Sequence, residues 1–176
     1  MNNGKTISAD TQRGAALLVA LLILIVVSVL GVSAMKTSMF AAKVATGTQA
    51  DAMVFEAAES SVADMFEVIG NLDDVNLTNF LANGVVLRRC LLNSGGRDGA
   101  CSSGDSMDAR NVITASSAAS EDGYVLIPGN QASTTANTPT FVDYSINIQG
   151  DADMDSFNIG ERHVQQILKT GILPGS

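Results

Sequence analysis

The sequence contains no tryptophan, and aromatic residues make up only 5% of its 176 residues. Basic residues are also few: ten Lys and Arg face 18 Asp and Glu, which gives a net charge of −8. Such an acidic balance lacks the clustered cations that contact phosphates, so it excludes a general nucleic-acid binder. The 46% of hydrophobic residues likewise excludes an acidic disordered chain.

Residues that carry enzyme chemistry are equally scarce. His163 is the one histidine, so a zinc site or a nucleophile–base pair would have to be built around it. The Gly-rich stretch SGGRDGACSSG (94–104) has no lysine and no strand-to-helix context, so it is not a phosphate-binding loop. We therefore predict a protein that is not an enzyme and has no resident cofactor, with calcium as the one candidate discussed below.

Proline is absent before Pro128, and one long apolar run lies in this part of the chain. Ala15–Met35 carries no charged residue and, as a helix, spans about 32 Å, close to the thickness of a bilayer core. Arg13 precedes the run and Lys36 closes it. A membrane-spanning helix is the favoured interpretation. A buried core helix and a cleaved secretory signal are the alternatives, although the run is long for a signal.

The polar N-terminus before this run carries Lys5 and Arg13, which favours a cytoplasmic N-terminus by the positive-inside bias. The remainder of the chain would then lie in the periplasm, anchored to the inner membrane by a single span.

The helical pattern continues beyond Lys36. Thr37–Ile69 is rich in good helix formers, and apolar residues recur at spacings of three and four, which predicts one buried stripe. The stripe consists of Phe55, Ala58, Val62, Phe66 and Ile69. Because Gly70 and Asn71 supply a C-terminal stop, we expect a single helix over residues 15–70.

The N-terminal region resembles a known family, the type IV pilus minor pilins of the PilX kind. The resemblance lies in Gln12-Arg13-Gly14, in the following run AALLVALLILIVVSVLGVSAM, and in Ala57-Ala58-Glu59. It implies a prepilin leader over residues 1–14, cleavage after Gly14 by a prepilin peptidase, and an N-methylated mature terminus at Ala15. It also implies helix packing with other minor and major pilins, and a head that ends on a pilus at the cell surface.

Most pilins carry Glu at the fifth mature position, which is Val19 here. A subunit without this carboxylate need not dock beneath an earlier one, so we hypothesise a place at or near the pilus tip, where a tip adhesin is a further possible partner. The family implies pilus assembly, twitching motility, adhesion or DNA uptake. A single-span periplasmic binding module and a type II secretion pseudopilin are the alternative functions.

Residues 71–176 are expected to form a globular α+β head, in which a small antiparallel β-sheet packs on the amphipathic half of the helix. Period-2 patterns or short apolar runs predict strands at Gly123–Pro128, Phe141–Gln149 and His163–Ile172, and residues 130–140 read as an exposed loop. Residues 93–106 read as a plain loop, and Cys90 and Cys101 favour a disulfide that staples it. A metal pair and a reactive nucleophile are the alternatives for these cysteines.

The segment 151–155 reads D-A-D-M-D, which is similar to the first half of a calcium-binding loop. Asp151, Asp153, Asp155 and Glu161 are the candidate calcium ligands. However, Ser156 replaces the turn glycine and Arg162 takes the twelfth position of the loop. A solvated turn between two strands is therefore the competing interpretation.

Overall fold

The structure, a computed structural model, describes residues 12–127 and 140–173. The predicted α+β class is confirmed: a long N-terminal helix, α1 (Gln12–Asn71), precedes a short helix, α2 (Asp74–Ala82), and a five-stranded antiparallel sheet. The chain divides into two compact units, the first ending at Gly47 and the second beginning at Thr48. The C-terminal part of α1 therefore belongs to the head, whereas the sequence predicted a head starting at residue 71.

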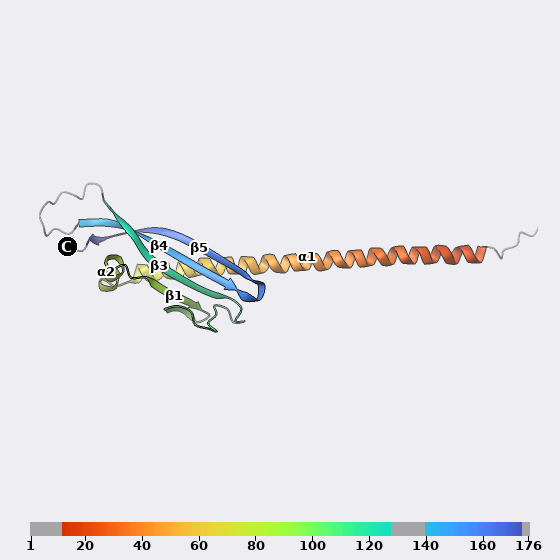
Figure 1. The fold of residues 1–176 in the computed structure, drawn as a ribbon, viewed down its shortest axis with the longest axis horizontal. Coiled ribbons are helices and arrows are strands. Elements are labelled where there is room, and N and C mark those ends of the chain that lie inside the picture. The colour runs from red at the N-terminus through yellow and green to blue at the C-terminus, as the bar shows by residue number, and fades with distance from the viewer. Residues whose placement is uncertain (1–11, 128–139, 174–176) are drawn as a thin grey trace, which may run out of the picture. The chain divides into compact units, whose positions relative to one another are not determined.

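Within the head, the strands lie in the order β2-β1-β3-β4-β5. Their bounds are Leu87–Leu92 (β1), Gly95–Asp98 (β2), Thr114–Leu126 (β3), Thr140–Met154 (β4) and Ile159–Leu173 (β5). Figure 1 shows the sheet lying along the C-terminal part of α1, with α2 beside the end of that helix. A short 3-10 turn, η2 (Asp155–Phe157), connects β4 to β5.

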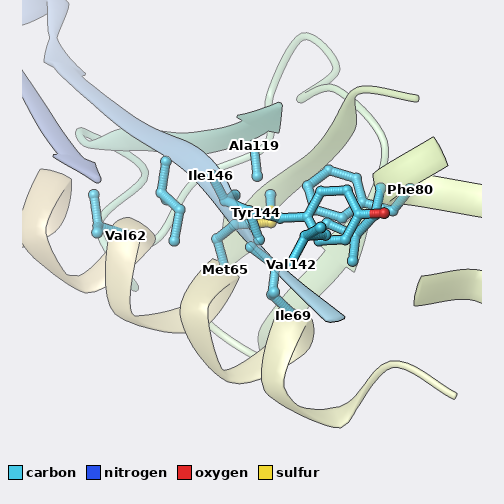
Figure 2. Packing of buried hydrophobic residues seen from close by; sticks show 10 residues of the cluster. Val62, Met65, Ile69, Phe80, Ala119, Val142, Tyr144 and Ile146 are labelled. Carbon is cyan, nitrogen blue, oxygen red and sulfur yellow. The ribbon is translucent and has the colours of Figure 1, made fainter. Parts of the chain in front are cut away.

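The larger hydrophobic core fills the space between α1, α2 and the sheet (Figure 2). Val142, Tyr144 and Ile146 of β4 alternate with half-buried or exposed residues, so every second side chain of the strand enters the core. They meet Met65 and Ile69 of α1 there. Phe80 of α2 closes the core at one end and is 1% exposed.

A second core cluster consists mainly of small residues and lets helix and sheet approach closely. Its buried members are Ala50, Val54, Ala57, Ala58, Ile113, Ala115, Ala152 and Met154. Beside it, Gly150 of β4 lies directly against α1. A Cβ at Gly150 would stand 2.5 Å from the carbonyl oxygen of Ala58 and 2.5 Å from Ser61 Oγ. Glycine is needed here because the helix backbone occupies the space of a side chain.

The predicted buried stripe of α1 is wrong at two of its five positions. Phe55 and Phe66 are 48% and 52% exposed, whereas Val54 and Met65 are fully buried. The buried arc thus still includes Ala58, Val62 and Ile69 but extends towards Val54 and Met65 instead of towards the two phenylalanines. Periodicity alone could not fix this choice, because both arcs carry apolar side chains at helical spacing.

Several strand boundaries also differ from the prediction. β3 begins at Thr114 instead of Gly123, and β4 continues to Met154 instead of ending at Gln149. β2 is a strand inside the segment predicted as a plain loop. The start of β3 reads TASSAAS, where alanine and serine alternate, and such small side chains give little hydrophobic signal. The predicted leader up to residue 11 and the predicted loop 130–139 lie outside the described residues.

Candidate functional site

The N-terminal unit exposes apolar side chains on every side of its helix. Each residue from Gly14 to Thr46 is exposed, and Leu17, Leu24 and Leu30 are among the most exposed large hydrophobic residues. By length and composition, this helix can cross a membrane. An isolated helix that is apolar all round requires lipid or other apolar helices as its surroundings. This segment is therefore the first candidate functional surface.

Hydroxyl groups of Ser28, Ser33, Thr37 and Thr46 in this helix bond to its own backbone. Ser28 Oγ donates to the carbonyl oxygen of Leu24 over 2.7 Å, and Ser33 Oγ donates to that of Val29 over 2.9 Å. Thr37 and Thr46 make the same bond to the residue four positions earlier. Such bonds remove the cost of placing a hydroxyl in a medium without water. The apolar run Ala15–Met35 is thus chemically suited to an apolar environment.

The predicted processing residues lie within α1. Gly14 and Ala15 are helical and exposed. Apart from the adjacent residues and the backbone of the helix itself, no atom lies within 4 Å of a Cβ built on Gly14. The packing of the chain itself therefore does not require glycine at position 14. Val19, at the position where most pilins carry Glu, is also exposed, at 54%.

In the head, a partly buried arginine joins the helix to the sheet. Arg89 of β1 donates from Nε to Asp64 Oδ2 of α1 over 2.6 Å and from Nη1 to Asp98 Oδ1 of β2 over 2.5 Å. The Arg89 side chain is 14% exposed. The hydrogen bond that Arg89 donates to Asp64, more than any other interaction, raises the pKa of the Arg89 guanidinium. The neighbouring Asp98 acts in the same direction, against the effect of burial.

Cys90 and Cys101 form a disulfide in the structure, with their Cα atoms 4.9 Å apart. Beside it, Arg97 Nη2 contacts Asp105 Oδ2 over 2.5 Å, and this hydrogen bond, followed by one from the backbone N–H of Ser102, lowers the pKa of Asp105. Among the described residues, Cys90, Cys101 and Asp105 are the group whose spacing could hold a metal ion. The two sulfur atoms are bonded to each other, so Cys90 and Cys101 act as a covalent crosslink.

The predicted calcium ligands are divided by the fold. Asp151 and Asp153 lie on β4, while Asp155 begins η2, so the acidic segment is mostly strand and not the turn that was expected. Glu161 pairs in register with Ala152, which places its side chain on the face of the sheet opposite to Asp151 and Asp153. Asp151 Oδ1 instead accepts a hydrogen bond from Arg162 Nε over 2.5 Å.

His163, the one candidate base, contacts an aromatic ring. Its ring centroid lies 4.3 Å from that of Phe55 in an edge-on arrangement. Two open clefts of about 480 and 560 Å³ lie at the edges of the core, and His163 lines neither of them. Their walls are largely apolar, with Tyr144 in the first and Arg89 in the second. Neither cleft pairs a nucleophile with a base in the described part of the chain.

Together, an apolar N-terminal helix and an antiparallel sheet packed on the same helix define a pilin-like protein of the α+β class. The comparison with protein families agrees, because the family described as PilX N-terminal matches residues 13–63. This match covers the N-terminal region and supports a PilX-like type IV pilin. This is a structural and not an enzymatic family. No curated protein and no solved structure matches the chain.

Sequence reasoning missed the contacts that join α1 to the sheet. Asp64 of α1 binds Arg89, a residue 25 positions later. Lys169 Nζ of β5 donates to the carbonyl oxygen of Ile69 over 3.0 Å and so caps the end of α1. Neither pairing leaves a local pattern in the sequence. A cation within an apolar strand, as at Arg89, is the one signal that could have indicated a buried partner.

Proposed function

We propose that this protein is a minor pilin that is made as an inner-membrane precursor, cut after Gly14, and inserted at or near the tip of a type IV pilus. The observation that carries the proposal is the exposed apolar surface of α1 from Ala15 to Met35, within a region that matches the PilX N-terminal family. As expected for this role, the segment carries no charge between Arg13 and Lys36.

Processing is the first step of the proposed role. The prepilin peptidase supplies the chemistry, and Gly14 is the residue it recognises, because a side chain at that position would obstruct cleavage. The structure offers no other reason for glycine there, since the space around it is open. After cleavage, Ala15 would become the N-methylated first residue of the mature protein.

Filament entry is the second step. When the helix moves from the bilayer into a bundle of pilin helices, it exchanges lipid contacts for protein contacts in surroundings that are equally apolar. The driving force is then close packing and not additional hydrophobic burial. Small residues such as Gly31 and Ala34 allow helices to approach, and the self-bonded hydroxyls of Ser28 and Ser33 add no polar penalty.

The proposed position of this subunit near the pilus tip depends on Val19. In a typical pilin, the carboxylate at this position would pair with the terminal amine of a neighbouring subunit, because a buried carboxylate requires a partner. Val19 offers no such pair, so this subunit has no need of a preceding neighbour. Pilus assembly, twitching motility, adhesion and DNA uptake are the activities that such a subunit would support, together with other minor pilins and a tip adhesin.

Fractionation of sheared pili tests this proposal. We expect the wild-type chain in the pilus fraction and a Gly14→Glu variant in the inner membrane, uncleaved. Gly47→Ala is the matched control, since this glycine of the same helix also has open space around it and lies outside the apolar run. A processed wild-type chain that never leaves the membrane would contradict filament entry and favour an anchored periplasmic module.

The tip position has its own test. A Val19→Glu variant would regain the carboxylate of an ordinary pilin, so we expect it to lose its place in a reconstituted tip complex. Unchanged assembly of the tip complex by this variant would show that Val19 does not determine the position.

A further inference from the structure

The two edges of the sheet differ sharply. At one edge, β2 has only four residues, and its Arg97 and Asp98 are both held in ion pairs. At the other edge, β5 runs for fifteen residues and pairs with β4 in an unbroken register. Within the described residues, no strand pairs with the outer side of β5.

An unpaired edge presents backbone N–H and C=O groups to any extended chain, and proteins usually protect it with charges, proline, bulges or short length. β5 has little of this protection. It contains no proline and no bulge, and Arg162 is engaged by Asp151 while Lys169 is directed to the end of α1. From Val164 to Leu168 the strand carries no charged residue.

Apolar side chains line the outer face of this same edge. Val164, Leu168 and Ile172 are 64%, 69% and 54% exposed. They lie at even positions of β5, so all three point to the side of the sheet away from α1. A strand added to the edge would place its own outward side chains next to these three residues.

On the other side of the sheet, α1 forms a shelf beneath the edge, made of Phe55, Glu59 and Phe66. The three positions lie on one flank of the helix. Phe55 contacts His163 of β5, while Asp64, on the opposite flank, binds Arg89 of β1. The shelf is therefore on the β5 side. Both phenylalanines are half exposed, and Glu59 is exposed and forms no ion pair with the described residues.

We propose that the free edge of β5 accepts an extended strand of a partner protein, made of uncharged β-forming residues with one Lys or Arg facing Glu59. The backbone of the edge requires an extended chain, and the shelf and the outer face require apolar side chains on both sides of it. This inference depends on the head alone. Its test is therefore independent of whether the protein enters a filament.

A different protein, and not a second copy of this chain, is the occupant that the charges favour. Each chain carries a net charge of −8, and a second copy would bring another acidic surface against Glu59. Like charges brought together in an interface oppose association. A neutral or basic strand meets no such opposition.

The test uses the full chain in detergent micelles and a synthetic nine-residue peptide of alternating valine and threonine with lysine at its centre. Amide hydrogen exchange of residues 159–173 is measured with and without the peptide. We expect exchange in β5 to slow by about tenfold at saturating peptide. The matched control peptide carries N-methyl groups on alternate amides and cannot pair through that edge, so it should leave exchange unchanged.

Two pairs of variants locate the site. Leu168→Lys should weaken peptide binding by about tenfold. Val125→Lys should not, since it places the same charge on the same face but on β3, which β4 separates from β5. Leu168 and Val125 are 69% and 64% exposed, so neither substitution removes a core contact. Phe66→Ala should weaken binding as well, whereas Val75→Ala on α2 should not.

Equal protection by both peptides, or no protection by either, would overturn the proposal. Protection of β5 that rises with protein concentration in the absence of peptide would also overturn it, because the occupant would then be a second copy of the chain.

Discussion

Arg89 Nε lies 2.6 Å from Asp64 Oδ2, and a second bond from Nη2 to Asp64 Oδ1 helps this pair join β1 to the C-terminal part of α1. The side chains are only 14% and 21% exposed, so solvent screens the pair weakly. The stability of the head thus depends on a contact between residues that are distant in sequence. The effect of removing this contact on the free energy of unfolding can be measured.

We expect Arg89→Ala to destabilise the head by about 2–3 kcal/mol, because it leaves the Asp64 carboxylate without its charged partner in a partly buried position. Unfolding in urea, followed through the near-ultraviolet circular dichroism of the two tyrosines, measures this change. Arg110→Ala is the control: its ion pair with Asp108 spans 3.4 Å and its side chain is 65% exposed. We expect a loss below about 1 kcal/mol there. Equal losses in both variants would contradict a special role for Arg89.

The close approach of helix and sheet at Gly150 gives a second prediction. Gly150→Ala should cost about 1–3 kcal/mol, because the added Cβ would collide with the backbone of Ala58 and the side chain of Ser61. Gly70→Ala, in the last turn of α1, meets open space and should change stability little. Thermal unfolding of the two variants beside the wild type measures the difference, and a Gly150→Ala protein as stable as the wild type would show that the helix is free to move aside.

Asp108 makes the stability of the head depend on pH. Burial by itself raises the pKa of this carboxyl. However, hydrogen bonds from the backbone N–H groups of Ile113, Val112 and Arg110 and from the Ser106 hydroxyl together outweigh burial and lower the pKa from 3.8 to about 2. Because the folded state binds this proton less readily than the unfolded state, the contribution is complete above pH 4 and is lost as the pH falls towards 2.

Unfolding measured between pH 6 and pH 2 checks this assignment. We expect Asp108→Asn to be less stable than the wild type at pH 6, and the difference to shrink as the pH approaches 2. A difference that stays constant over this range would mean that the carboxylate charge is not what stabilises the loop.

Calorimetric titration with calcium tests the acidic segment of β4. We expect no heat of binding at millimolar calcium, because Asp151 is held by Arg162 and Glu161 projects from the other face of the sheet. Binding heat that disappears in an Asp153→Asn variant would contradict this expectation and would restore the calcium interpretation of the sequence.

The sequence predicted those features that depend on local pattern. The apolar run from Ala15, the stop at Asn71 and the alternation around Ile146 each appear in the structure as helix, helix end and strand. By contrast, the start of β3 and the strand β2 escaped prediction. These two segments are rich in serine, alanine and glycine, which give almost no hydrophobic signal. Pairing with neighbouring strands fixes the conformation of both segments.

The candidate site divides in the same way. Gly14 and Ala15 remain predicted processing residues, named because they stand next to a long apolar run. The edge of β5 and the shelf of Phe55 and Phe66 leave no such pattern in the sequence. Their exposure follows from the rotation of α1 against the sheet and from the strand order, which are properties of the packed head.

The mass of the N-terminal peptide of the protein isolated from its cells tests the central claim most directly. We predict a peptide that begins at Ala15 and carries one additional methyl group, because a PilX-like pilin would lose residues 1–14 on processing. A protein that retains the residues from Met1 to Gly14 would contradict the account and leave the chain a membrane-anchored module outside the pilus.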